Sequence, residues 1–342
     1  MDKAKQEIII SWATLFRIFF IVVLAVAFFM IREALLILFL SIVISAAFDG
    51  PVTALEKRKI PRIIGTLLVF ILTLGVIAMI LYTVIPVGIT EFKGFLDNVS
   101  RFNIPVFGSL QGDYFQKLDL SLNTLADSLF SGSSSILDFI GVLFGNMILV
   151  ITTIVITFYL TVSREGVEKF LRTVLPLAYE EYAIGFYHRV RRKMGFWLQA
   201  QLVLMLTVGC VVFLGLWLLG VRYSLLLAVI AGSLEIVPVA GPMFSGIIGF
   251  LVASSSSFLL GVYTAILFFI VHQLESNFLI PLIMRRTIGI NPVVVVIALL
   301  AGSQIAGLIG IILAVPTAVI VEELFDDWEE RKVRVRNTRL EI

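Results

Sequence analysis

The sequence predicts an all-α polytopic membrane protein with about 6 to 8 membrane-embedded helical segments. Of its 342 residues, 59% are hydrophobic and 15% are charged, whereas soluble domains are about 45 to 50% apolar and about 25% charged. Five uncharged runs, residues 63–90, 139–163, 194–221, 236–274 and 287–321, each exceed the roughly 20 residues that a spanning helix needs. Spanning strands would instead give weak alternations of about ten residues, so the runs are predicted to be helices.

Charge and turn patterns divide the chain into six parts. They are N-terminal membrane helices (1–90), an extracytoplasmic amphipathic segment (91–138), a transmembrane helix (139–162), cytoplasmic amphipathic helices (163–193), a C-terminal membrane core (194–321) and a cytoplasmic tail (322–342). Residues 8–48 are expected to form a tight helical pair, and the Gly-Pro in "DGPVTALEKRKIPR" to break the chain before the next span. Basic residues of that segment and of 163–193 favour the cytoplasmic side, so both termini are expected there.

The C-terminal core predicts two opposed re-entrant or broken helical hairpins, residues 223–253 and 291–321. If every run were a full span, Arg285 and Arg286 would lie outside, the wrong side for a basic anchor. Arms of about twelve residues are too short to cross about 30 Å at 1.5 Å per residue. Two opposed hairpins would form an inverted repeat of the kind found in secondary transporters. Eight plain spans are the alternative.

The tip of the first hairpin, "GSLEIVPVAGP", holds the first candidate site. Glu235 lies in a stretch with no other Asp, Glu, Lys or Arg from residue 223 to 274. A carboxylate inside a membrane costs a few kcal/mol, and such residues mark ion or substrate paths. Pro238, Gly241 and Pro242 break the helix and free backbone groups that bind ions or polar solutes. The structural alternative is a glutamate that only fixes helix packing.

A second polar cluster, "HQLESNFLIP", follows at residues 272–281. On a helix His272 shares a face with Glu275 and Ser276, and Gln273 with Ser276 and Asn277. Glu275 is the candidate carrier of a proton or cation, because neighbouring hydrogen-bonding groups stabilise either protonation state. Gln273 and Ser276 fit a polar seam between helices equally well. His272 carries little weight, since a lone histidine is seldom a metal ligand.

Several function classes find no support in the sequence. A single cysteine, Cys210, allows no intrachain disulfide and no cysteine cluster for a metal. A net charge of +2 is too small to indicate a nucleic-acid partner. The glycines from 302 to 310 lack the Lys-Ser/Thr of a phosphate loop, and neither HExxH nor G-x-S-x-G occurs. We therefore expect no enzyme, no metal and no cofactor.

Three further motifs are "EIVPVAGP", "QLESNFLIPLIMRRTIGINPVVVV" and "AGSQIAGLIGIILAVPTA". Together they resemble the AI-2E or autoinducer-2 exporter-like (PerM-like) permeases of bacteria, a resemblance that covers most of the chain and is most specific in its C-terminal third. They place the helix-break and hinge residues of the family pattern on Pro238, Gly241, Pro242, Pro281, Pro292, Gly302, Gly307, Gly310 and Pro316. The first motif reads V-P in place of I-P, and the second has one residue between Gln and Glu.

This resemblance implies a multi-pass protein of the bacterial cytoplasmic (inner) membrane that moves a small polar solute and assembles as a homo-oligomer. Some relatives are linked to autoinducer-2 export and others to exchange of sodium or lithium for protons. The expected function is a secondary transporter of a small polar solute or monovalent cation, coupled to a proton or sodium gradient. The expected ion-binding set is Glu235, Glu275, Gln273, Asn277, Ser276 and Asn291. The alternatives are an oligomeric channel and a non-transporting scaffold or regulatory protein.

Overall fold

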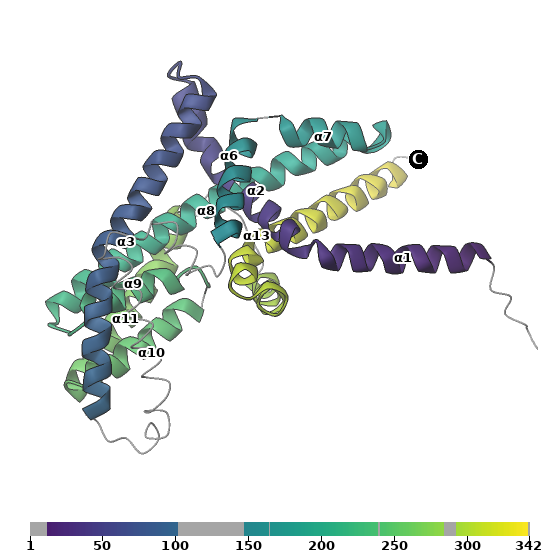
Figure 1. Cartoon of the computed structure of the whole chain (residues 1–342). Coiled ribbons are helices and arrows are strands. Elements are labelled where there is room, and N and C mark those ends of the chain that lie inside the picture. The colour runs from purple at the N-terminus through teal and green to yellow at the C-terminus, as the bar shows by residue number, and fades with distance from the viewer. Residues whose placement is uncertain (1–11, 102–146, 164, 239, 284–291, 341–342) are drawn as a thin grey trace, which may run out of the picture.

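The computed structural model describes residues 12–101, 147–163, 165–238, 240–283 and 292–340, and every regular element in that part of the chain is helical. Figure 1 shows their arrangement. The helices are α1 (Trp12–Met30), α2 (Arg32–Glu56), α3 (Arg62–Arg101), α6 (Met147–Val162), α7 (Gly166–Val174), α8 (Leu177–Leu218), α9 (Ser224–Leu234), α10 (Ala240–Ser254), α11 (Phe258–Leu274), the π-helix η1 (Glu275–Leu279), α12 (Ile280–Ile283) and α13 (Pro292–Leu340).

Five of these helical stretches are long and apolar enough to cross a membrane. The bent pair of Ile148–Val162 and Gly166–Val174, which meet at 85°, would make a sixth if it counts as one span. The prediction of an all-α polytopic membrane protein is therefore confirmed. The amphipathic segment and the membrane core meet inside α8, which continues across residue 193 without interruption.

Both predicted hairpins are broken helices. In the first, α9 has 11 residues and α10 has 15, or about 16 Å and about 22 Å of helix, so neither arm spans a bilayer. The two arms pack against each other. In the second, α13 is interrupted at Ala306 and Gly307, where the backbone leaves helical geometry. Gly307 has φ +55°, in the left-handed region that favours glycine. The orientation of the hairpins in the bilayer stays a prediction, and Arg285 and Arg286 lie outside the described residues.

Glycines also let the arms of the second hairpin touch. A Cβ added at Gly302 would overlap the backbone carbonyl of Gly310, and a Cβ at Gly310 would overlap that of Gly302. Residues eight apart on one straight helix are about 12 Å apart. This mutual contact therefore requires the chain to fold back on itself near Gly307. Pro292 is the first residue of α13 and Pro316 lies buried inside it.

Two expectations for the N-terminal helices were wrong. The tight pair does not form, because α1 extends away from the body and its described side chains are exposed (Figure 1). The Gly-Pro pair does not end a helix either, because α2 continues through Pro51 to Glu56. Proline lacks the N–H that would bond the carbonyl of Ala47, and the Gln199 side-chain amide of α8 donates to that carbonyl instead.

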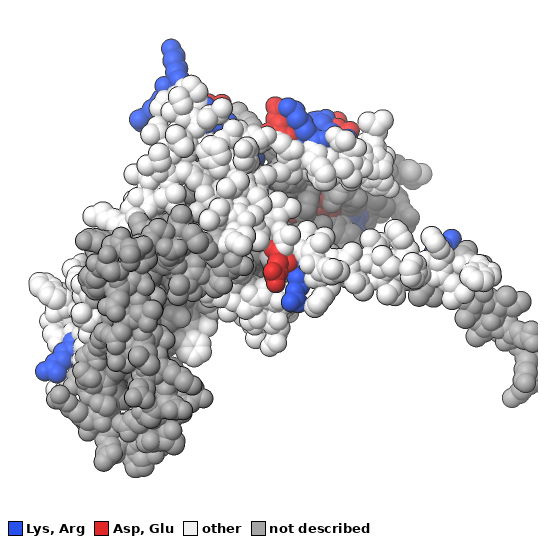
Figure 2. All heavy atoms as spheres, in the orientation of Figure 1, with Lys and Arg blue, Asp and Glu red and all other residues white. Residues whose placement is uncertain are grey.

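Two apolar clusters form the described core, and α8 contributes to both. One joins the C-terminal half of α8 to α9, α10 and α11, and the other joins its N-terminal half to α2 and α13. Figure 2 shows charged side chains gathered over α7 and the turn between α2 and α3, with few on the helices below them. The candidate site lies in the cluster of α8 to α11, away from this charged end.

Candidate functional site

Glu235 lies at the break between α9 and α10 and is 2% exposed. Helix α9 ends at Leu234, and Pro238 and Pro242 prevent the helix from continuing. The N–H of Glu235 still donates to the Ala231 carbonyl at 3.2 Å. Its own carbonyl accepts a 2.7 Å hydrogen bond from the side-chain amide of Gln201 on α8. The break is therefore held against α8 by a buried polar contact.

Glu275 lies at a second irregularity, where α11 passes into the π-helix η1. Its carbonyl accepts from the N–H of Ile280, five residues on. Pro281 is the second residue of α12 and has no N–H to donate to the carbonyl of Asn277. Single π-turns inside helices occur frequently at functional sites. The Glu275 side chain points inward and the residue is 4% exposed.

These two irregular segments bring Glu235 and Glu275 together. Their side-chain carboxyls lie within hydrogen-bonding range of each other. Among the described residues, no Lys or Arg forms an ion pair with either carboxyl. Two adjacent carboxylates shielded from water repel each other, so a pair of this kind shares a proton or binds a cation.

His272 completes the site from the last turn of α11. Its Nδ1 lies 3.6 Å from Oε2 of Glu275, which is longer than a hydrogen bond. This nitrogen is buried and has no hydrogen-bond partner among the described residues. The imidazole therefore keeps a free nitrogen beside the carboxyl pair. In the part of the chain that the structure describes, no group of three or more His, Cys, Asp or Glu could hold a metal ion.

An apolar groove runs from the molecular surface to His272. It has a volume of about 560 Å³ and lies between α10 and α11. Pro242, Phe250 and Phe268 are among its lining residues, and His272 is the polar side chain at its end. The groove thus borders His272, which lies next to Glu275.

The glycine and prolines of the first motif shape the break itself. A Cβ at Gly241 would overlap the carbonyl oxygen of Leu234, so α10 approaches the end of α9 through this glycine. The carbonyl of Pro238, which Pro242 cannot bond, accepts from the N–H of Ala240 at 2.8 Å. The fold thus brings Glu235 out of the helix and directs the chain back along α9.

The remaining predicted ligands do not surround the carboxyl pair. Gln273, Ser276 and Asn277 are exposed. The Asn277 side-chain amide donates a 2.9 Å hydrogen bond to the Gln273 carbonyl, one turn earlier. Asn291 lies outside the described residues. Within the expected set, the structure therefore brings together Glu235 and Glu275.

Gln201 is the functional candidate that the sequence argument missed. It is 2% exposed and binds the Glu235 carbonyl across 34 positions of sequence. A polar amide within the uncharged run 194–221 was the available signal. His272 was noticed through its helical spacing from Glu275, yet it received little weight as a lone histidine.

Comparison with known proteins identifies relatives along most of the chain. Residues 18–330 match the family model described as "AI-2E family transporter". "Putative transport protein YrrI" of Bacillus subtilis is 27% identical over 80% of this chain and 80% of its own length. "Putative transport protein YueF" of the same organism is 25% identical over 81% of this chain and 79% of its own. "Putative permease PerM" of Escherichia coli K12 is 22% identical, with 86% and 88% covered.

Proposed function

Because the chain belongs to the AI-2E family of membrane transporters, we propose that it is a secondary transporter in which Glu235 and Glu275 form the coupling site. The observation that carries the proposal is the contact between two buried carboxyls that no Lys or Arg of the described residues neutralises. Two such groups lower stability unless a proton or cation is bound between them. A pair of this kind is therefore suited to ion exchange rather than to packing.

The chemistry of the pair makes a proton and a monovalent cation competing occupants. With one proton bound, one carboxyl donates a hydrogen bond to the other and the net charge is −1. Once the proton leaves, two negative groups face each other and attract a cation such as sodium. His272 Nδ1, 3.6 Å from Glu275, is positioned to exchange a proton with the pair. Exchange of one occupant for the other is the elementary step of an antiporter.

The solute in this proposal is a small polar molecule or a monovalent cation that reaches the site when the broken helices move. Helix α9 ends at Leu234 and α10 begins at Ala240, and α13 bends at Gly307. Broken helices of this kind form the binding sites of many secondary transporters. Movement of the hairpins against the N-terminal helices would expose the pair to alternate sides of the membrane.

The orientation in the membrane follows from charge. The end of the molecule with α7 and the turn between α2 and α3 carries the basic residues (Figure 2), and short basic segments remain cytoplasmic. We place this end, both termini and the tail of α13 on the cytoplasmic side of a bacterial inner membrane. Helix α7 exposes Phe170 and Val174, which suits a helix lying on the membrane surface.

Reconstituted transport tests the proposal. Glu235→Gln and Glu275→Gln proteoliposomes are compared with the wild type under imposed proton and sodium gradients, using alkali ions and small polar solutes. Glu33→Gln is the matched control, because Glu33 is an exposed glutamate on α2. We expect both site variants to lose coupled flux and the control to keep it. Normal coupled flux in either site variant would refute the assignment.

The same assay separates the two alternatives. A channel would give flux that does not depend on a counter-gradient, together with single-channel currents in planar bilayers. A scaffold or regulatory protein would give no flux for the wild type under any imposed gradient. The carboxyl pair favours the coupled transporter over both, since neither alternative requires a titratable pair in the membrane core.

A further inference from the structure

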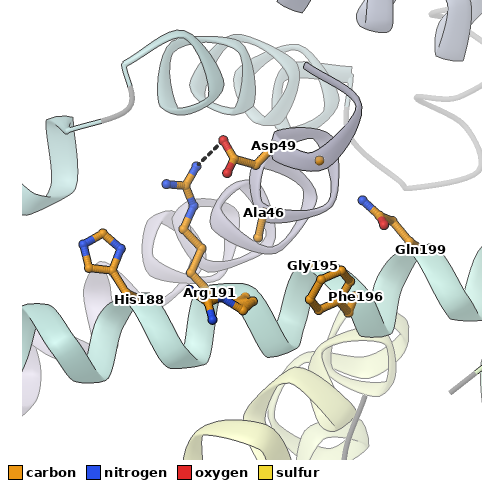
Figure 3. Close-up of a pocket in the computed structure, with 9 residues that line it drawn as sticks. Ala46, Asp49, His188, Arg191, Gly195, Phe196 and Gln199 are labelled. Carbon is orange, nitrogen blue, oxygen red and sulfur yellow. Dashed lines mark ion pairs between the residues drawn. The ribbon is translucent and has the colours of Figure 1, made fainter. Parts of the chain in front are cut away.

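A second cavity borders α8 between His188 and Gln199, on the N-terminal side of the Gln201 that contacts Glu235. It has a volume of about 220 Å³ and lies between α2 and α8. Figure 3 shows His188, Arg191 and Gln199 along α8, with Asp49 of α2 on the opposite side. Arg192 also lines this cavity. None of these residues belongs to the proposed coupling site.

Close contacts between α2 and α8 border the cavity. A Cβ added at Gly195 would overlap the Ala46 carbonyl, so the two backbones are in contact there. One turn further, a Cβ at Gly50 would lie 3.1 Å from the Gln199 amide nitrogen. Glycines at the crossing keep the helices close without filling the space beside them. The polar ends of α8 side chains therefore border an open pocket.

The pocket has more positive charge than its acids neutralise. Asp49 is its acidic residue, and Arg62 already binds that carboxylate at 2.6 Å. Arg191 forms a second, longer ion pair with the same carboxylate, at 3.6 Å (Figure 3). Arg192 is exposed and forms no ion pair or hydrogen bond with another described residue. Both guanidinium groups therefore keep N–H donors for an anion.

The acids of α13 near Arg192 already have basic partners on α8. A neighbouring cavity contains Glu323, Asp326 and Asp327 as well as Arg192. Arg189 pairs with Glu323 and Asp327, and Lys193 pairs with Glu323 and Asp326. Arg192 is thus the basic side chain shared by the two cavities that no described acid binds.

The pocket lies where α8 passes from charged to apolar sequence. Arg189, Arg191, Arg192 and Lys193 are followed by 28 uncharged residues, 194–221. Basic residues at such a boundary lie at the level of lipid headgroups, and basic pockets between membrane helices bind anionic headgroups. Phe196 lines the pocket and is 39% exposed, and exposed apolar residues such as Leu202 and Leu206 continue along α8. An acyl chain would find a continuous apolar surface below the pocket.

We propose that the α2–α8 pocket binds the phosphate of an anionic phospholipid headgroup. Arg192 and Arg191 donate N–H groups to the phosphate oxygens, and the acyl chains lie along Phe196 and the apolar surface of α8. Guanidinium forks match phosphate geometry in a way that an ammonium group does not. This lipid site is separate from the coupling site and does not depend on the transport proposal.

Lipid binding to purified protein in neutral detergent tests the site by native mass spectrometry. The probes are dioleoyl phosphatidylglycerol, dioleoyl phosphatidylcholine and inorganic phosphate. We expect the wild type to bind phosphatidylglycerol more tightly than phosphatidylcholine. Arg192→Gln should weaken phosphatidylglycerol binding by about fivefold or more, as expected for one basic contact near a membrane surface. Arg192→Lys should give an intermediate loss, because it keeps the charge and loses the fork.

Arg58→Gln is the matched control, since Arg58 is an exposed arginine in the turn after α2 and lines neither cavity. It should leave phosphatidylglycerol affinity unchanged within about twofold. Arg192 is exposed, so its variant is expected to fold, and an unchanged thermal unfolding midpoint checks this. Equal losses for the two variants would overturn the site. Equal binding of phosphatidylcholine, or displacement of the lipid by inorganic phosphate, would overturn its assignment to an anionic lipid.

Discussion

Three glutamates are buried in the described chain, and two regions of the molecule use them in opposite ways. Glu235 and Glu275, 2% and 4% exposed, face each other between α9 and η1. Glu323 on α13, also 4% exposed, faces two cations on α8, Arg189 and Lys193. Burial is therefore the same while the charge environment is reversed.

The difference separates a structural role from a functional one. A buried carboxylate with two basic partners holds helices together, and removing it leaves those partners without a counter-charge. A buried carboxylate beside another carboxylate stabilises nothing in its ionised form. The proposed exchange of protons or ions would account for its presence in the membrane core. Burial alone would have suggested one role for all three glutamates.

The largest expected effect is at the carboxyl pair. Glu235→Gln and Glu275→Gln should lower coupled flux by about hundredfold or more, the scale on which a positioned proton-transfer group contributes. Neither should lower the thermal unfolding midpoint in detergent, because removing one of two like charges relieves repulsion. Flux and unfolding are measured on the same preparations. A large loss of stability would place these glutamates in the structural class with Glu323.

Glu323→Gln should give the reverse pattern. It leaves Arg189 and Lys193 without their buried partner and should cost about 2 kcal/mol of unfolding free energy, less than for a fully buried pair because both cations are partly exposed. Flux per folded molecule should stay near the wild-type level. Asp326→Asn is the control, since Asp326 is 59% exposed and 3.6 Å from Lys193. Equal costs for the two variants would show that the burial of Glu323 is unimportant.

Gln201→Leu tests whether the break at Glu235 needs its contact with α8. The substitution leaves the buried Glu235 carbonyl without a donor, at a cost of about 1 kcal/mol in unfolding free energy. Thr207→Val is the comparison, because its hydroxyl bonds within α8 to Val203. Hydrogen exchange should increase around 231–238 in the Gln201 variant. Protection unchanged there would mean that packing alone positions the break.

The smallest effect is expected at the surface, where Arg172 of α7 bonds Glu168 at 2.8 Å and Glu180 of α8 at 2.6 Å. The hydrogen bond from Arg172 lowers the pKa of Glu168 below its ordinary value. The resulting contribution to folding is present above the ordinary glutamate pKa and is lost as pH falls through the lowered one. Arg172→Gln should increase hydrogen exchange of α7 slightly at neutral pH. At a pH low enough to protonate Glu168, variant and wild type should exchange alike.

Local chemistry explains what could be predicted from the sequence. Uncharged runs require helices in a bilayer, and two prolines four residues apart with a glycine between them favour a break, so the helical class and the first break followed directly. The break near Gly307 could be predicted from the sequence for the same reason. Glu235 and Glu275 were identified as candidates because carboxylates are costly in a membrane.

Contacts between distant segments explain what could not be predicted. Pro51 was expected to end α2, and the Gln199 amide that permits the helix to continue comes from 148 residues away in sequence. The bond from Gln201 to the Glu235 carbonyl is equally invisible to local spacing. The π-turn at Glu275 depends on packing that no short motif encodes. The separation of α1 from the other helices likewise depends on tertiary contacts and not on its own sequence.

Helix α8 has a mechanical consequence for the two glutamate regions. Its 42 residues form one uninterrupted rod of about 63 Å. Lys193, which binds Glu323, and Gln201, which holds the Glu235 backbone, are eight residues or about 12 Å apart on it. A tilt of α8 that moves Lys193 away from Glu323 therefore also moves Gln201 relative to the Glu235 backbone. The contacts of the two glutamate regions are therefore mechanically coupled through one rigid helix.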